Sequence, residues 1–544
     1  MKRRIFCLIL CLIMVVPMLA SCGSEKEEEE IVETSSREAV TLSMYVITEK
    51  ETTPAASQAV EDAINKLIKA KYTTKLEITF LTADEYYSKA EAQIAGMKAG
   101  TASLPAEDET DTGDESEALT TEATVVNEYG VKELKYPDLT PSQIDILMID
   151  DYSKYLDYAQ KGWLYSLNDT LKNTSKKLGD YIYPTILETT NVGGITYAVP
   201  TNMPIGDTCT YMIIDRDLAD EYGLELALDS SIYDCADFFA WVKENKTDVT
   251  PIAGQYDKIG ATYVNVDSAK RAFTNSFSLV GKYGYSSSAE AEYLLANENY
   301  RSELLSNAKY RFEGYFGAEN AESFAAKIKT GTLEEAARDA ENYEVIVLEG
   351  EYKTGEELCR SMFAITRYTQ NFNRAMEIIT LLNTNSEFRN LLQYGIENVN
   401  YVIDAETGVL SRLNSEYMMD IYKTGNVFMA YPEEGMPAEI WNVAKKLNLA
   451  SIGYDVDSYV SFEIPDDKAA SEGESEGFTV DFTSSRALAD ASAELKAALD
   501  GCGTYEEYSK TLNEAVEKYA SVASEFLSTS NENTPYALYV SEGN

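Results

Sequence analysis

The stretch QIDILMI at residues 143–149 is a short run of mainly apolar side chains, and it predicts a buried strand. Two similar runs precede it, AVTLSMYVI at residues 39–47 and KLEITFL at residues 75–81. The stretches between these runs have helical spacing, at residues 59–70 and 83–97. Three strands that alternate with two helices predict a mostly parallel, doubly wound α/β sheet.

Length and composition set bounds on the architecture. A chain of 544 residues exceeds one hydrophobic core, so we expect two or more lobes. Hydrophobic residues make up 44% of the chain, enough to fill such cores despite a formal net charge of −45. A field of that sign repels nucleic acid and anionic lipid headgroups, so neither is expected as a partner.

The residue inventory excludes several kinds of chemistry. The chain contains no histidine, which removes the usual general base, histidine-activated nucleophiles and the commonest zinc ligand. It has no dinucleotide-binding, P-loop or EF-hand pattern, so we expect no cofactor, no metal and no catalytic residues. A hydrolase that works through two carboxylates stays open, because glycosidases need only two acids.

The cysteines give no disulfide framework. Four of the seven lie beyond the N-terminal region, scattered and without the spacing of metal ligands. The sequence leaves open whether Cys209 and Cys235 form a disulfide. The other two are Cys359 and Cys502.

The first 38 residues have the pattern of a targeting signal rather than of a folded segment. Residues 1–21 have a basic start and a short apolar block, the layout of a signal peptide. The sequence LASC, which ends at Cys22, resembles the lipobox of bacterial lipoproteins, in which that cysteine is acylated. If Cys22 is acylated, residues 22–38 form an acidic tether between the lipid and the folded chain. The alternative is an ordinary signal peptide with a chance cysteine.

Two acidic stretches predict disorder. Residues 100–140 contain PAEDETDTGDESEALTTEATVV, which interrupts the α/β series between a predicted helix and the strand at residues 143–149. Because this insertion lies at the amino edge of the sheet, it should face away from a ligand crevice. Residues 466–477 form a second such loop.

Across most of the chain, segments in the correct order resemble the extracellular solute-binding lipoproteins of bacterial ABC importers, most closely the sugar-binding branch and a larger lipoprotein subgroup. The sequence departs from the family in its acidic insertion and in carrying Tyr where sugar binders often carry Trp. Beside the lipobox, the matching segments are IDILMIDDYSKYLDYAQKGWLYSLND (144–169), GGITYAVPTN (193–202), YMIIDRDLADEYGL (211–224), FAITRYTQNFNRAMEIITLLNTNSEFRNLLQYGIENVNYV (363–402), GNVFMAY (425–431) and EIWNVAKKLN (439–448).

This resemblance implies a fold of the periplasmic-binding-protein type: two doubly wound α/β lobes with a hinge and an interlobe ligand cleft. It also implies a monomer on the extracellular face of a Gram-positive-type cell membrane, held only by its lipid anchor and working with ABC permease subunits. The expected boundaries are lobe I at residues 39–165, lobe II at 166–319, a return to lobe I at 320–360, and lobe II with C-terminal helices at 361–544.

Candidate ligand-binding residues follow from predicted strand ends, because loops after strands face the ligand crevice of open α/β sheets. Carboxylates and amides bind hydroxyl groups, and aromatic rings cover the apolar face of a sugar. Asp150 and Asp151 have an equal alternative role as helix caps, and any one tyrosine is more often core or surface. The full set is Thr48, Glu49, Asp150, Asp151, Tyr152, Tyr155, Asn202, Gln255, Tyr256, Asn426 and Trp441.

The leading hypothesis is therefore a receptor that captures a small solute, most simply a carbohydrate or oligosaccharide, and delivers it to a permease. A receptor for peptide-type solutes is the rival within this class. A surface glycoside hydrolase with a carboxylate pair, and a sensor that uses the same fold without transport, are the alternatives from other classes.

Overall fold

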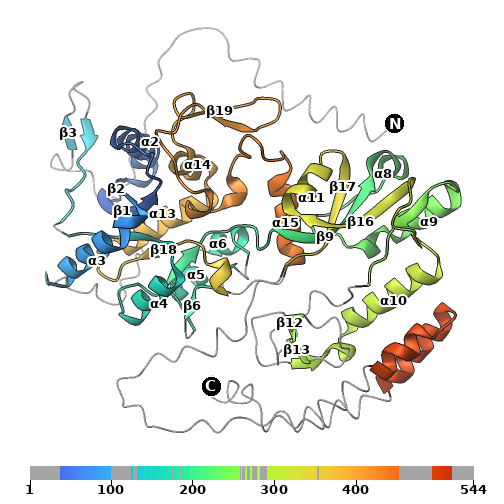
Figure 1. Ribbon diagram of the computed structural model, residues 1–544. Coiled ribbons are helices and arrows are strands. Elements are labelled where there is room, and N and C mark those ends of the chain that lie inside the picture. The colour runs from blue at the N-terminus through green and yellow to red at the C-terminus, as the bar shows by residue number, and fades with distance from the viewer. Residues whose placement is uncertain are drawn as a thin grey trace, which may run out of the picture.

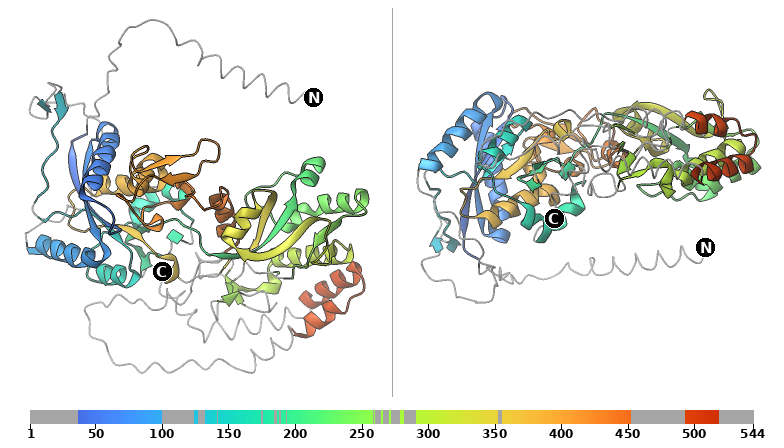
Figure 2. Two further views of the ribbon diagram at one scale, coloured as in Figure 1. Left: turned by 45° about the horizontal axis from the view of Figure 1, so that its top comes forward. Right: turned by 90° about the horizontal axis from the view of Figure 1, so that it is seen from below.

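The computed structural model places two α/β lobes side by side (Figures 1 and 2). Helix α13 (Phe372–Thr384) packs in the first lobe, and α14 (Ser386–Tyr394) and α15 (Ile440–Ala450) lie toward the region where the lobes meet. It describes residues 37–99, 124–126, 132–140, 142–173, 176–183, 186–187, 189–192, 194–257, 259, 264–265, 270–271, 279–281, 291–351, 355–451 and 493–517. The predicted signal peptide, Cys22, most of the tether and the loop at 466–477 lie outside these residues.

The first lobe is built on a five-stranded sheet in the order β2-β1-β5-β18-β8. β1 runs parallel to both β2 and β5, whereas β18 runs antiparallel to β5 and β8. The sheet is therefore mixed rather than fully parallel, because a strand from far along the chain is inserted into it. The strands are β1 (Val40–Thr48), β2 (Thr74–Thr82), β5 (Ile146–Ile149), β8 (Ala198–Pro200) and β18 (Met362–Ile365).

The helices of this lobe begin and end at local sequence signals. The Thr53 side chain caps α2, Pro54 stands in its first turn, and Thr73 ends it in the left-handed conformation. Residues 372–394 form two helices, α13 and α14, because Asn385 ends the first and caps the second. The others are α2 (Pro54–Tyr72), α3 (Ala83–Ala99), α4 (Tyr152–Gln160), α5 (Asn168–Asn173) and α6 (Lys176–Tyr181).

The second lobe has its own five-stranded sheet in the order β15-β10-β16-β9-β17. β10 runs parallel to β15 and β16, and β9 runs antiparallel to β16 and β17. The strands are β9 (Thr208–Asp215), β10 (Thr250–Ala253), β15 (Phe316–Gly317), β16 (Phe324–Thr332) and β17 (Tyr343–Glu349), and the helices are α8 (Arg216–Tyr222), α9 (Ala236–Asn245), α10 (Glu298–Phe312), α11 (Leu333–Asp339) and α15.

The chain passes between the lobes three times, and these crossings correct the predicted boundaries. The first crossing, residues 201–207, joins β8 to β9, so residues 166–200 belong to the first lobe. The second, residues 350–361, joins β17 to β18, so β16 and β17 belong to the second lobe rather than to a return at 320–360. The third lies before α15. The pairing of distant strands decides these boundaries, and a short stretch of sequence does not show which strands pair.

Short elements complete the chain. Within the insertion predicted to be disordered, β3 (Thr124–Val126) pairs with β4 (Lys132–Leu134), so this part has ordered backbone pairing; most of the rest lies outside the described residues. Helices at residues 493–500 and 505–517 lie beside α10 (Figure 1). Their apolar side chains form one cluster with those of α10. Minor ladders are β6 (Asn191–Val192) with β7 (Ile195–Thr196), β11 (Val264–Asn265) with β12 (Lys270–Arg271), β13 (Leu279–Gly281) with β14 (Ala291–Tyr293), and β19 (Tyr401–Ile403) with β20 (Leu410–Arg412).

Separate hydrophobic cores underlie the two sheets. One contains β1, β5 and β18 side chains such as Met44, Ile146 and Phe363, and another packs beneath β9 and β10 around Phe239. A third cluster, which includes Tyr211 and Trp441, joins the second sheet to α15. The predicted architecture of two α/β lobes is confirmed.

Candidate functional site

The carboxyl ends of the first sheet are covered by a segment from late in the chain. Residues 417–431, here called the waist segment, contain only two single turns, η4 (Ile421–Lys423) and η5 (Val427–Met429). Three predicted site residues, at or just beyond the ends of β1, β5 and β8, contact it through their side chains: Thr48, Asp150 and Asn202. These predicted residues therefore lie at one edge of the sheet, and part of that edge is occupied by the chain itself.

At the end of β1 the contacts are made to one carbonyl group. The Thr48 hydroxyl lies 3.0 Å from the Met418 carbonyl oxygen, and the Glu49 amide donates to the same oxygen at 3.1 Å. The side chain of Thr48 is buried and that of Glu49 is exposed. Thr48 thus holds the waist segment, because its hydroxyl is hydrogen-bonded to the Met418 carbonyl oxygen of that segment.

At the end of β5, Asp150 forms the charged contact with the waist segment. Its carboxylate accepts a hydrogen bond from the Tyr87 hydroxyl at 2.7 Å and pairs with Lys423 Nζ at 2.7 Å. The Asp150 and Lys423 side chains are only 15% and 19% exposed, so the pair is shielded from water. Burial and the adjacent Asp150 carboxylate raise the pKa of Tyr87.

Beyond β8, two predicted residues meet each other. Asn202 Nδ2 lies 3.3 Å from Asn426 Oδ1 and donates to the Tyr181 carbonyl oxygen at 2.6 Å. The Val427 amide donates to the Asn202 carbonyl oxygen at 2.8 Å, and Asn426 also caps η5. Both side-chain amides are buried, so they fasten the first crossing to the waist segment.

Asp151 and the two tyrosines of α4 have other partners. Asp151 caps α4, with its carboxylate accepting from the Lys154 amide at 3.0 Å. Tyr155 is fully buried and donates to the Thr190 carbonyl oxygen, and the Tyr152 hydroxyl lies 3.4 Å from the Thr189 carbonyl oxygen.

The predicted residues of the second lobe do not join this group. Gln255 is exposed, and the Tyr256 hydroxyl donates to the Leu348 carbonyl oxygen at 3.3 Å. Trp441 is buried in the core beneath α15. None of the predicted residues lines the cavity described next.

A cavity of about 320 Å³ lies where the crossings and the waist segment meet. Its polar side chains come from three separate parts of the chain: Asp207 from the first crossing, Glu357 and Arg360 from the second, and Tyr422 from the waist segment. A site at this point therefore touches both crossings. The remaining lining residues are Met203, Pro204, Ile205 and Gly206.

The cavity combines a cation, an aromatic ring and two carboxylates. The Arg360 guanidinium carbon lies 5.4 Å from the centre of the Tyr422 ring, a cation–π contact. Burial raises the pKa of Tyr422, and the Arg360 charge partly offsets that rise. Carboxylates accept hydrogen bonds from hydroxyl groups, a guanidinium donates them, and an aromatic ring covers CH groups. This combination is suited to a polyhydroxylated molecule.

The shape of the first crossing is fixed by side chains from the second crossing and from α15. The Glu351 carboxylate accepts from the Thr208 amide at 2.8 Å, and a Cβ atom on Gly206 would lie 2.7 Å from Glu351 Cβ. Asn448 on α15 donates to the Met203 carbonyl oxygen and accepts from the Ile205 amide, both at 2.8 Å. Sequence reasoning missed the cavity residues because they lie on crossings; the signal available was the Pro-Ile-Gly turn after GGITYAVPTN.

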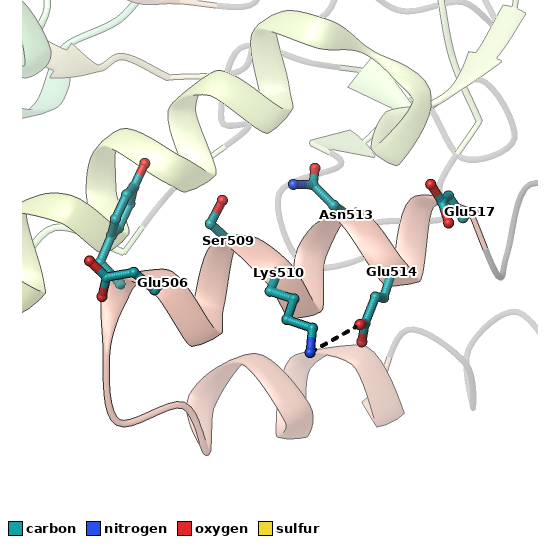
Figure 3. Close-up of a pocket in the computed structure, with 7 residues that line it drawn as sticks. Glu506, Ser509, Lys510, Asn513, Glu514 and Glu517 are labelled. Atoms are coloured by element: carbon teal, nitrogen blue, oxygen red, sulfur yellow. Dashed lines mark ion pairs between the residues drawn. The ribbon is translucent and has the colours of Figure 1, made fainter.

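A second concavity, of about 500 Å³, lies on the C-terminal helix at residues 505–517 (Figure 3). All seven lining residues belong to this one helix, and Lys510 pairs with Glu514 at 3.6 Å on its exposed surface. A surface formed by a single helix encloses no ligand, so the cavity at the crossings is the candidate site.

Within the part of the chain that the structure describes, three further features concern metal ligands, disulfides and membrane-spanning helices. There, no group of three acidic or cysteine side chains could hold a metal ion. Cys209, Cys235 and Cys359 are buried free thiols and Cys502 is a partly exposed one, so Cys209 and Cys235 are not paired. No helix among the described residues has the length and apolar character needed to cross a membrane.

Comparisons with known proteins identify relatives at low identity. No protein-family model matches the chain. A carbohydrate ABC transporter substrate-binding protein of Streptococcus pneumoniae serotype 4 is 24% identical over 325 residues, which span 56% of this chain and 64% of that relative. The solved N-glycan transport solute binding protein of Streptococcus pneumoniae aligns with 93% of this chain and 100% of its own at 19% identity and a TM-score of 0.39. An extracellular solute-binding protein of Alicyclobacillus acidocaldarius aligns with 89% of this chain and 99% of its own, at 12% identity and a TM-score of 0.32.

Proposed function

We propose that this chain is the solute-binding lipoprotein of a bacterial ABC importer, and that it captures a carbohydrate, most simply an oligosaccharide, for delivery to the permease. The observation that carries the proposal is the polar cavity formed by two crossings and the waist segment between two α/β lobes. The name of the pneumococcal relative, a carbohydrate ABC transporter substrate-binding protein, supports it.

Capture follows from differential affinity. A solute in the cavity contacts residues that belong to both crossings, so it favours the one arrangement of the lobes in which all contacts form. Hinge closure of this kind is a common response of two-lobed binding proteins. Tyr422 would cover a sugar ring, while Asp207, Glu357 and Arg360 would bind its hydroxyl groups. No covalent step is required.

The proposal extends to the cell surface. Signal cleavage before Cys22 and acylation of its thiol would hold the protein on the extracellular face of a Gram-positive-type membrane as a monomer. Residues 22–38 would act as a flexible, charged tether. Mass spectrometry of protein from the native membrane tests this part, since a mature chain without lipid on Cys22 contradicts it.

A panel of oligosaccharides tests the main proposal. The full chain is heated with each sugar, and the sugar is afterwards analysed by chromatography. Saturation at about 100 times the dissociation constant should stabilise the fold by about 2.7 kcal/mol and leave the sugar intact. Arg360→Ala should lose the shift. Arg338→Ala, which removes an arginine with a 55% exposed side chain on α11, should keep it.

The other outcomes point to other functions. Released monosaccharide would indicate a hydrolase that uses carboxylates, with Asp207 and Glu357 as the first pair to replace. Stabilisation by peptides and by no sugar would indicate a peptide receptor. Either result overturns the carbohydrate proposal.

A further inference from the structure

Helix α14 carries an unusual set of buried polar side chains. Arg389 and Gln393 are fully buried and Asn390 is 3% exposed, although the helix is only 9 residues long. Polar and charged side chains of these types are rarely buried without a specific partner. Burial lowers the pKa of Arg389, and its guanidinium donates to the Asn390 side-chain oxygen at 3.0 Å.

All three side chains bind the backbone of the waist segment. Arg389 donates to the Ile421 carbonyl oxygen at 2.9 Å, and Asn390 donates to the Met429 carbonyl oxygen at 3.0 Å. Gln393 donates to the Met419 carbonyl oxygen at 2.8 Å and accepts from the Thr424 hydroxyl. These contacts lie on both sides of Tyr422, the residue that the waist segment contributes to the cavity.

The waist segment depends on such contacts for its conformation. It has two single turns and no longer helix or strand, so few of its own backbone hydrogen bonds define its path. Its other side is held at the strand ends, where Met418 meets Thr48, Lys423 pairs with Asp150, and Asn426 meets Asn202. The segment is therefore fixed between the sheet edge and α14.

We infer that Arg389 and Gln393 are positioning residues of the cavity: they hold the waist segment so that Tyr422 stands against Arg360, although neither can touch a solute. This inference rests on the proposed function, because it assigns them a part in capture. It also explains why polar side chains, rather than apolar ones that would pack at lower cost, occupy the buried face of α14.

Limited proteolysis of the full chain tests the inference without any solute. Trypsin cleaves after lysine, and Lys423 lies in the middle of the waist segment with its side chain 19% exposed. Gln393→Met keeps the volume of the side chain but removes both hydrogen bonds. Cleavage after Lys423 should then speed up by about tenfold or more, because proteolysis follows the population of locally opened states.

A matched control separates positioning from general destabilisation. Asn65 is a buried amide of the same lobe that also makes two backbone hydrogen bonds, to the Leu76 carbonyl oxygen at 2.7 Å and from the Leu76 amide at 2.8 Å. Asn65→Leu should lower the melting temperature to a similar degree and leave cleavage after Lys423 unchanged. Arg389→Met should behave like Gln393→Met, and hydrogen exchange of residues 417–431 should rise in both.

The outcomes distinguish the two proposals. Equal cleavage after Lys423 in Gln393→Met and Asn65→Leu, or unchanged hydrogen exchange across the waist segment, overturns the positioning role whatever the protein binds. A failure of every sugar to stabilise the unmodified chain overturns the proposed function, while the proteolysis result still reports on the waist segment. If Gln393→Met releases the segment yet binds sugar as the unmodified chain does, the segment does not serve capture and the inference is wrong.

Discussion

Replacing Gly425 by alanine should destabilise the chain much more than the same change at Gly435. Both glycines have a φ of +96°, so both substitutions force a side chain into backbone space that favours glycine. They differ in their surroundings. A Cβ atom on Gly425 would overlap the Leu382 carbonyl oxygen and lie 3.0 Å from Leu382 Cβ, whereas a Cβ atom on Gly435 has nothing within 4 Å.

The magnitude follows from these two contributions. A left-handed backbone costs an L-residue about 1–2 kcal/mol, and this cost applies to both variants. Overpacking against a fixed backbone adds about 1–3 kcal/mol, and this cost applies to Gly425→Ala alone. Replacing glycine by alanine also lowers the conformational entropy of the unfolded chain, which stabilises both variants to the same degree. This contribution therefore cancels in the comparison. Gly425→Ala should therefore exceed Gly435→Ala by about 1–3 kcal/mol in free energy of unfolding.

Urea unfolding followed by circular dichroism and by tryptophan fluorescence measures this difference. The slope of free energy against urea should stay unchanged, because neither substitution alters the surface exposed on unfolding. Gly425 lies in the waist segment and Leu382 lies on α13, so the comparison tests how closely these two pack. If the two variants unfold within about 0.5 kcal/mol of each other, which is the spread of neutral surface changes, the close approach is refuted.

Three further predictions concern charge and thiols. Lys423→Met should cost about 1–2 kcal/mol, because it leaves the shielded Asp150 carboxylate without its cation, whereas Lys510→Met on an exposed helix should leave the urea midpoint unchanged. Equal effects would contradict this. Burial raises the pKa of Cys359 to about 12, so this thiol should react with Ellman's reagent only after unfolding, unlike the partly exposed Cys502. Because the pKa is higher in the folded state, the stability that this thiol contributes is complete below its unfolded pKa near 9 and is lost as the pH rises toward 12, which alkaline urea titration measures.

The candidate site shows where local patterns carry information and where they do not. Asp150 was predicted from the end of a strand, and the structure confirms that it lies at the sheet edge with Thr48 and Asn202. The sequence could not show that the waist segment binds these groups, because that segment lies more than 200 residues further along the chain. Their roles as ligand contacts remain predictions. Tyr422 and Arg360 gave no signal, since each lies in an irregular segment whose position depends on both lobes.

By itself, the sequence determined the first three strands, the two helices between them and the α/β class of fold. The period of its apolar residues specifies strands and helices locally, and the alternation of these elements specifies α/β lobes. The missing histidine and the acidic charge likewise needed no structure to restrict the chemistry.

Only the tertiary structure decided which strands share a sheet and which residues contact the waist segment. β18 joins the first sheet between β5 and β8, whereas β16 and β17 pair with β9 in the second sheet. The physical reason is that strand pairing and the burial of Arg389 and Gln393 against backbone carbonyl groups are contacts between distant parts of the chain. Their energy depends on three-dimensional proximity, which no short window of sequence records.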